Sequence, residues 1–402
     1  MKKILKFVTV LTAFSSLLTA ADFEAIVIKG ENKLTVNEAE GVLSLKSAGP
    51  EALKKKKTSV VSYARRAISE QDGTGNAVSF EFKGDGSDFF ASVFLSESKN
   101  LVDAHEAIFP LSSTKWQKRV ITFEEFARNA KPWNKPKMTE KNIHPIMESL
   151  TYMGFGRGFK YHRYNHPDYS FAIRNFKFVQ APKVKNLAIK KGIDAFVGKL
   201  ANDEPVKILL LGDSITEHGK ELSHTYHAMQ LLGKKAKVVN AAIGGQTSRG
   251  GEIIFERSLR KLPNPDLIVI MYGANDCNNM GEGTGFNDLV FEKHLMNLIN
   301  KVNHSTNGKC EFLLINGVPR VDKETRISEN RVEPLLPAIE RVSKQYDLIL
   351  CDTMSRFLAN SKEENDQYYK DGIHQNQEGL KFMGEIIAET IKASLVSGSQ
   401  NI

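Results

Sequence analysis

The stretch Val206-Lys207-Ile208-Leu209-Leu210-Leu211-Gly212-Asp213-Ser214-Ile215-Thr216 joins a nearly continuous apolar run to a short polar turn. An apolar run of this length is typical of a strand that is buried on both faces of a parallel sheet. Gly212 permits a tight turn directly after such a strand, which places Ser214 at the carboxyl edge of the sheet. Taken alone, the pentapeptide 212–216 fits a helix N-cap as well as a nucleophile.

The residues that follow repeat the pattern of a short apolar run and then a longer segment of helical spacing. The apolar runs are Val238–Ala242, Leu267–Tyr272, Phe312–Val318 and Leu348–Cys351. The segments of helical spacing are Phe291–Val302, Pro334–Tyr346 and Gly379–Ala393. Strands that alternate with helices predict a doubly wound α/β domain with a parallel sheet, which we assign to residues 206–396. Sites in such domains form at the carboxyl ends of the strands.

Residues 22–180 have a different pattern and predict an all-β domain of the jelly-roll or sandwich type. Stretches rich in Val, Phe and Ile are separated by turns that contain Gly, Asp, Ser or Pro. These stretches are Ala77–Phe82, Phe89–Leu95, Lys118–Phe123 and Phe171–Val179. Several short strands joined by turns are typical of β-sandwiches and jelly rolls. The Lys-rich segment 181–205 is expected to be a linker or a docking segment.

Residues 1–21 have the order of a secretory signal peptide, in which lysines precede an apolar run that ends in small residues. The apolar run Ile4–Ala20 is short for a membrane-spanning helix, and an uncleaved anchor is the alternative. We therefore expect a periplasmic or secreted protein with no membrane insertion once the signal is removed. The formal net charge of +8 then becomes +5, because the signal holds three lysines. The run Lys54–Lys57 is interpreted as a solvated loop, and no nucleic-acid partner is expected.

Three further motifs carry residue types that suit acyl transfer. Asn240–Ser248 contains paired glycines, whose unshielded N–H groups suit an anion at a strand-to-helix turn. In Gly273–Asp276, the Asn275 amide follows another strand and is an uncharged donor for an oxyanion. A Gly between Asp371 and His374 lets the carboxylate meet the imidazole, which orients the ring as a base. Each motif alone also fits an ordinary turn, and the last pair could instead be two metal ligands, although no further ligands cluster around it.

In this order, the four motifs resemble the consensus blocks of the SGNH (GDSL-type) hydrolases over residues 206–394, with Ile215 where the family usually has leucine. The resemblance implies a Ser–His–Asp triad and an oxyanion hole made of two N–H groups and one amide. The implied residues are Ser214, His374 and Asp371 for the triad, and Ser214, Gly245 and Asn275 for the oxyanion hole. Gly244 is the alternative to its neighbour Gly245. No metal and no cofactor are implied.

The first half is similar to galactose-binding-like jelly-roll domains, through the segments 109–126 and 152–176. Some carbohydrate acetylesterases join such a domain, which sometimes holds a structural calcium, to an SGNH domain. The combined resemblance implies an exported serine esterase that deacetylates an acylated polysaccharide or oligosaccharide. A lipid esterase or thioesterase is the alternative within the enzyme class, and a non-catalytic glycan-binding protein is the alternative outside it.

Several other residues have two interpretations. Cys310 and Cys351 are expected to be buried packing residues, with a disulfide between them left open. The histidines that follow the serine motif are interpreted as structural or cleft-lining in preference to a zinc site; they are His218, His224 and His227. The two tryptophans, Trp116 and Trp133, are core residues or sugar-stacking platforms. Asp276 is expected to brace the Asn275 loop.

Overall fold

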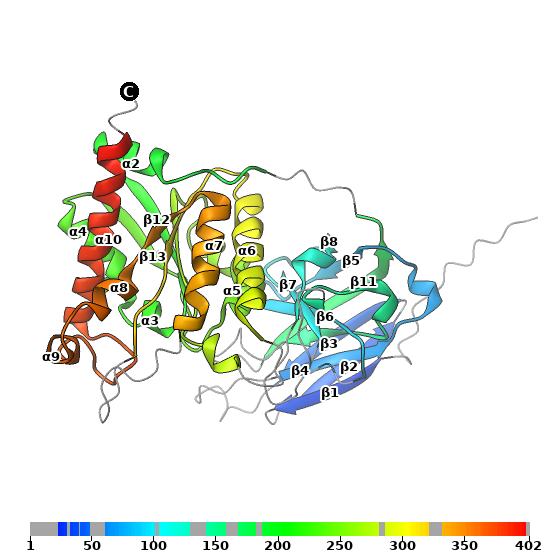
Figure 1. Ribbon diagram of the computed structural model, residues 1–402. Helices are drawn as coiled ribbons and strands as arrows, with labels where there is room; N and C mark the ends of the chain where they lie inside the picture. Colours follow the sequence, from blue (N-terminus) through cyan, green and yellow to red (C-terminus); the bar gives the residue numbers. More distant parts are fainter. Residues whose placement is uncertain are drawn as a thin grey trace, which may run out of the picture.

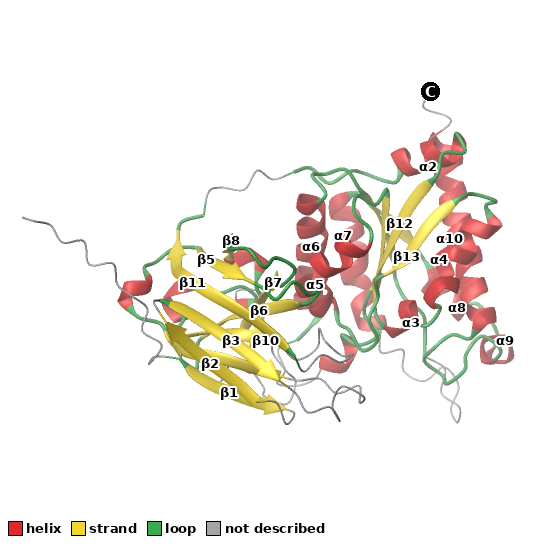
Figure 2. Cartoon of the chain, turned by 180° about the vertical axis from the view of Figure 1, so that it is seen from behind, coloured by secondary structure: helices red, strands yellow, loops and turns green. Residues whose placement is uncertain are grey.

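The computed structural model describes residues 23–29, 33–39, 41–48, 61–99, 101, 104–128, 142–157, 168–181, 187–280, 286–320 and 332–398. The predicted signal peptide, the lysine run 54–57 and Trp133 lie outside the described residues. Figures 1 and 2 show a β domain and an α/β domain side by side.

Two antiparallel sheets form the β domain. The six-stranded sheet has the order β1 (Glu24–Lys29), β4 (Val61–Ala67), β10 (Tyr152–Arg157), β6 (Phe90–Ser96), β7 (His105–Pro110) and β9 (Ala127–Arg128). The five-stranded sheet has the order β2 (Lys33–Ala39), β3 (Val42–Ala48), β11 (Tyr169–Val179), β5 (Ala77–Lys83) and β8 (Gln117–Thr122). The predicted all-β region is therefore confirmed. Its identity as a jelly roll and the exact domain boundaries stay predictions.

Aromatic rings fill the space between these two sheets. Phe80 of β5 contacts Phe109 of β7 and Phe155 of β10 edge-on, with ring centroids 5.3 and 5.5 Å apart. All three side chains are almost completely buried. Each of these contacts joins one sheet to the other, so the rings hold the two layers together by apolar burial and by their preferred edge-to-face geometry.

The α/β domain is built on a parallel sheet with the order β13 (Ala236–Asn240), β12 (Val206–Gly212), β14 (Leu267–Met271), β15 (Glu311–Ile315) and β16 (Ile349–Cys351). Its helices are α2 (Asp194–Ala201), α3 (Ser214–Glu217), α4 (His224–Leu231), α5 (Ser248–Lys261), α6 (Asp288–Ser305), α7 (Leu336–Tyr346), α8 (Thr353–Leu358), α9 (Lys362–Asp366) and α10 (Gln377–Gly398). The predicted α/β fold class is confirmed, with strand ends that differ from the apolar runs by a few residues.

Both faces of the sheet are covered, which explains why its strands are apolar at nearly every position. Leu209 and Leu211 of β12 belong to one apolar cluster with α5, α6 and α7. Ile208 and Leu210 belong to a second cluster, with α2, α4, α8 and α10. The alternation of side chains along a strand thus supplies both clusters from one continuous run. Helix α2 lies in the segment that was expected to be a linker, and it packs into the second cluster through buried Phe196 and Leu200.

The structure also bears on the cysteines that the sequence analysis considered. Cys277, Cys310 and Cys351 are buried free thiols, so the disulfide that the sequence left open is not formed. Within the described part of the chain, no helix has the length and apolar character needed to cross a membrane.

Candidate active site

Ser214 occupies the tight turn that follows β12. A Cβ atom on Gly212 would lie 2.5 Å from the Thr216 hydroxyl oxygen and 2.7 Å from the Met271 carbonyl oxygen, so only glycine fits there. The next residue, Asp213, is the N-cap of α3, because its carboxylate accepts the Ile215 N–H at 2.9 Å. The capping role that the sequence left open thus falls to Asp213, and the Ser214 hydroxyl is available for another partner.

That partner is His374, which comes from the loop before α10. Its Nε2 lies 2.8 Å from Ser214 Oγ, and its Nδ1 lies 2.8 Å from Asp371 Oδ2. Gly372 has a φ of 77°, a left-handed conformation that glycine adopts without strain. This turn brings the carboxylate back onto the ring that follows it. The structure therefore joins the three predicted side chains in one hydrogen-bonded chain.

The Asp371 carboxylate also accepts two backbone donors. The N–H groups of Ile373 and His374 lie 3.1 and 2.8 Å from its Oδ1. Partial burial would raise the pKa of this carboxyl, but the hydrogen bonds from His374 and Ile373 outweigh it and lower the pKa to about 2. Asp371 is consequently a fixed negative charge that holds the ring in place and favours a proton on Nδ1.

The paired glycines after β13 differ in what their N–H groups do. The Gly244 N–H donates to Glu217 Oε2 at 2.7 Å, so this donor is already committed. Gly245 has a φ of 75°, which turns the backbone sharply at this residue. Of the two glycines, Gly245 is therefore the better candidate for the oxyanion hole.

Asn275 follows β14 and is tied to the same turn. Its Nδ2 donates to the Gln246 carbonyl oxygen at 3.1 Å, and this leaves the second amide hydrogen for another acceptor. The neighbouring Asp276 is buried and accepts the N–H and the hydroxyl of Ser248, the first residue of α5, at 3.0 and 2.6 Å. Asn275 and Asp276 therefore both brace the turn that contains Gly245.

Glu217 is a site residue that sequence reasoning missed. It lies on α3, one turn after Ser214, and its bond to the Gly244 N–H joins the serine turn to the glycine turn. In the sequence, a single glutamate after a serine motif is indistinguishable from an ordinary helix residue. Its partner is found only in the structure, where the loops after β12 and β13 lie side by side.

The histidines after the serine motif separate into two environments. The ring of His218 lies 4.5 Å from that of His374, centroid to centroid, and it lines the site. Burial, with the nearby Lys370 and His374, lowers the pKa of His218. His224 is completely buried and its Nδ1 lies 3.0 Å from the Thr225 hydroxyl. No group of three or more His, Cys, Asp or Glu side chains suited to a metal ion occurs in the described ranges.

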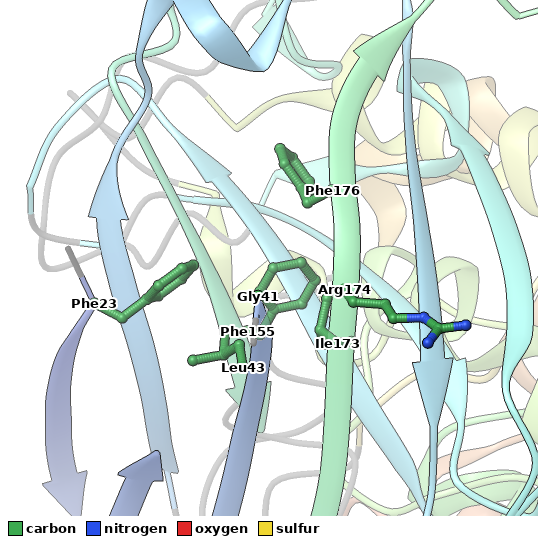
Figure 3. A pocket seen from close by; sticks show the side chains of 7 residues that line it. All are labelled: Phe23, Gly41, Leu43, Phe155, Ile173, Arg174 and Phe176. Atoms are coloured by element: carbon green, nitrogen blue, oxygen red, sulfur yellow. The ribbon is translucent and has the colours of Figure 1, made fainter. Parts of the chain in front are cut away.

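Two features of the described part of the β domain bear on sugar binding, namely the surroundings of Trp116 and a small cavity. The Arg174 guanidinium lies 4.2 Å from the Trp116 ring centroid, so a cation covers a face of this ring. A small cavity is lined by Phe23, Gly41, Leu43, Phe155, Ile173, Arg174 and Phe176 (Figure 3). Its volume is about 10 Å³, which is close to the least that one water molecule needs. Figure 3 shows the Arg174 guanidinium pointing away from the other labelled side chains.

A serine, a histidine and an aspartate joined at the carboxyl edge of a parallel sheet are the arrangement of a serine hydrolase. Residues 210–382, which include every predicted site residue, match the model of the GDSL-like Lipase/Acylhydrolase family. The match to this family thus lies within the α/β domain of the chain.

Similar proteins are known by sequence and by structure. An acetylxylan esterase of Xylanibacter ruminicola is 25% identical over 265 residues, which cover 60% of this chain and 49% of that protein. This chain therefore spans about half the length of the curated relative. The crystal structure of the acetyl xylan esterase AlAXEase is 22% identical, with a TM-score of 0.39, and the match covers 46% of this chain and 98% of that one. A lipase/acylhydrolase from Enterococcus faecalis is 21% identical, with a TM-score of 0.39 and coverage of 47% and 96%.

Proposed function

We propose that this protein is an exported serine esterase that removes acetyl groups from a polysaccharide or oligosaccharide. The observation that carries the proposal is the hydrogen-bonded chain from Ser214 through His374 to Asp371, with both bonds to the ring at 2.8 Å. It lies within the segment that matches a family of acylhydrolases. Export rests on the signal-like order of residues 1–21.

The geometry supports a two-step acyl transfer. His374 Nε2 takes the hydroxyl proton as Ser214 Oγ bonds to the ester carbonyl carbon, and Asp371 stabilises the imidazolium. The tetrahedral intermediate collapses, the imidazolium returns the proton to the leaving sugar oxygen, and an acyl-serine remains. Water then repeats the attack, with His374 as the base, and acetate is released.

The oxyanion of both intermediates needs donors that are already in place. We assign this role to the N–H groups of Ser214 and Gly245 and to the Asn275 amide. One such donor is worth about 3–4 kcal/mol of transition-state stabilisation. The bonds that fix the glycine turn and the Asn275 side chain support this assignment, because they order these groups before the substrate binds.

One observation and the proposed export favour acetylated glycan over other esters. The relative from Xylanibacter ruminicola is described as an acetylxylan esterase, and the proposed export places the protein among extracellular polysaccharides. A lipid esterase is the second candidate, since lipases share the family model. Rates on a panel of acetylated glycans and on acetyl and octanoyl esters separate the two. Fast octanoyl hydrolysis without acetate release from any glycan contradicts the carbohydrate proposal.

The test of the mechanism is Ser214→Ala. We expect the rate on a chromogenic acetate to fall by about 10⁴-fold or more, because the variant has no nucleophile. Its melting temperature should stay close to that of the wild type, since the hydroxyl lies at the partly exposed edge of the sheet. Ser214→Ala activity within about tenfold of the wild type overturns the assignment.

A further inference from the structure

An apolar cluster between the two domains contains Ile243, which belongs to the glycine turn, the turn of residues 243–247 that holds the paired glycines. Side chains alternate along β7, so Ala107 and Phe109 face the interior of the β sandwich, whereas Ile108 faces outward. An isoleucine on the outer face of a sheet needs another surface to cover it. That surface is α5, and the cluster consists of Phe90, Ile108, Ala127, Ile243, Ile253 and Ile254.

Polar contacts surround this cluster and join the same elements. The Arg119 guanidinium of β8 forms an ion pair with Glu256 of α5. The Arg260 guanidinium lies 4.8 Å from the centroid of the Phe90 ring. Figures 1 and 2 both show α5 lying against the β domain, beside β7. Helix α5 therefore has the parallel sheet on one side and the β domain on the other.

The glycine turn lies between these contacts. Ile243 is two residues before Gly245, and its N–H donates to the Gly212 carbonyl at 3.1 Å. Its side chain is buried in the cluster that holds Phe90 and Ile108 of the β domain. Three residues after Gly245, Ser248 begins α5. Both ends of this short segment are thus fixed by elements that contact the β domain.

We propose that the β domain positions the oxyanion hole, with Ile108 and Phe90 as positioning residues that act through Ile243. The proposal rests on the proposed function, since it takes Gly245 to be an oxyanion donor. It gives the β domain a role in the hydrolysis of every ester, small ones included, and this role is independent of glycan binding. Displacing a group by about 1 Å in an active site costs as much as 10²-fold in rate, so a small relaxation of this cluster is sufficient.

The experiment compares Ile108→Ala with Ile173→Ala in the full-length chain. Ile173 of β11 is equally buried but belongs to the interior cluster of the sandwich. Ile108→Ala should reduce kcat on a small soluble acetate by about tenfold with little change in KM. Ile173→Ala should leave kcat within about twofold of the wild type at a temperature where both variants are folded. Ile108→Val and Ile173→Val give the same comparison if either alanine variant fails to fold.

Hydrogen exchange of peptides that cover residues 240–250 provides a readout that needs no activity. Exchange there should be faster in the Ile108 variant and unchanged in the Ile173 variant. Equal exchange in both variants overturns the proposal, as does a kcat that falls equally in both. A wild-type protein that cleaves no ester contradicts the proposed function, whereas the exchange data still decide whether the β domain orders the turn.

Discussion

Hydrogen bonds from its neighbours hold the Asp371 carboxylate beside the His374 ring. Two backbone N–H groups and the His374 ring surround a carboxylate that remains half-exposed. The folded-state pKa of about 2 lies below the ordinary value of 3.8 for an aspartate. Its contribution to stability is therefore present above about pH 4 and is lost as the pH falls from 3.8 towards 2.

The lowered pKa of Asp371 leads to a prediction for the pH dependence of the rate. Because the pKa of Asp371 is about 2, protonation of this carboxylate should not contribute to the acid limb of kcat/KM, which should reflect one proton only. Asp371→Asn should reduce kcat by about 10⁴-fold, since an amide cannot stabilise the imidazolium. The measurement is the rate on a soluble acetate between about pH 4 and 9. A limb that needs two protons contradicts this interpretation, and so does an Asn variant with near-normal kcat.

Among the connecting elements, the short helix α3 carries both the nucleophile and a brace for the next loop. Glu217 accepts the Gly244 N–H at 2.7 Å, so it restrains the turn without touching the reacting atoms. Glu217→Ala should lower kcat about tenfold and change KM little, because the turn loses this restraint.

Glu217→Gln is the matched variant, since its amide oxygen still accepts the N–H, and it should recover most of the activity. Glu221→Ala, an exposed position on the same stretch, should behave as the wild type. Steady-state kinetics on a soluble acetate measure all three variants. If Glu217→Gln is as impaired as Glu217→Ala, the charge and not the hydrogen bond is what matters.

The same scale shows why the fold was predictable from the sequence. Runs such as Val206–Leu211 and Leu267–Tyr272 are apolar at consecutive positions because both faces of the sheet are covered. This pattern is visible in the amino-acid sequence alone. The site motifs follow these strands directly, so their meeting at one edge follows from the parallel arrangement. The turn at Asp371–His374 involves only neighbouring residues, and the glycine within it indicates that the carboxylate can meet the imidazole ring.

Other features depend on contacts between distant segments and left no local signal. The strands β1 to β4 were not predicted individually, since their alternation is mixed with Lys, Glu and Ser. Ile108 reads as one more apolar residue in a strand until α5 is seen to cover it. The bond that occupies the Gly244 N–H, and so favours Gly245 as the oxyanion donor, comes from Glu217, 27 residues before Gly244.

Over the whole molecule, a buried charge joins the α/β domain to the β domain. Glu252 of α5 is completely buried; its carboxylate accepts His294 Nδ1 at 2.7 Å and Lys301 Nζ at 2.5 Å. Lys301 Nζ also donates to the Glu125 carbonyl oxygen of the β domain at 2.9 Å. Desolvation would raise the pKa of Glu252, but Lys301 and His294 outweigh it and lower the pKa to about 2.

Lys301→Met should therefore destabilise the protein strongly. The variant leaves a buried carboxylate without its cation, which costs about 3–5 kcal/mol, and it removes the bond to Glu125. The double variant Lys301→Met with Glu252→Gln should recover a large part of this loss, because the remaining amide is neutral. Arg341→Met is the control, since the Arg341 guanidinium pairs with Asp288 and Glu292 at a partly exposed site. This substitution should cost less than about 1 kcal/mol.

Urea unfolding at neutral pH measures the free energy of unfolding for each variant. A second series at lower pH tests the direction in which the free energy of unfolding changes with pH. The stabilisation of ionised Glu252 is present above its ordinary pKa of 4.5 and is lost as the pH falls towards about 2. The gap between the wild type and Lys301→Met should therefore narrow over this window. The double variant has no ionisable group at position 252, so its own free energy of unfolding carries no dependence on the ionisation of Glu252. If Lys301→Met costs no more than Arg341→Met at neutral pH, the buried charge does not join the two domains energetically.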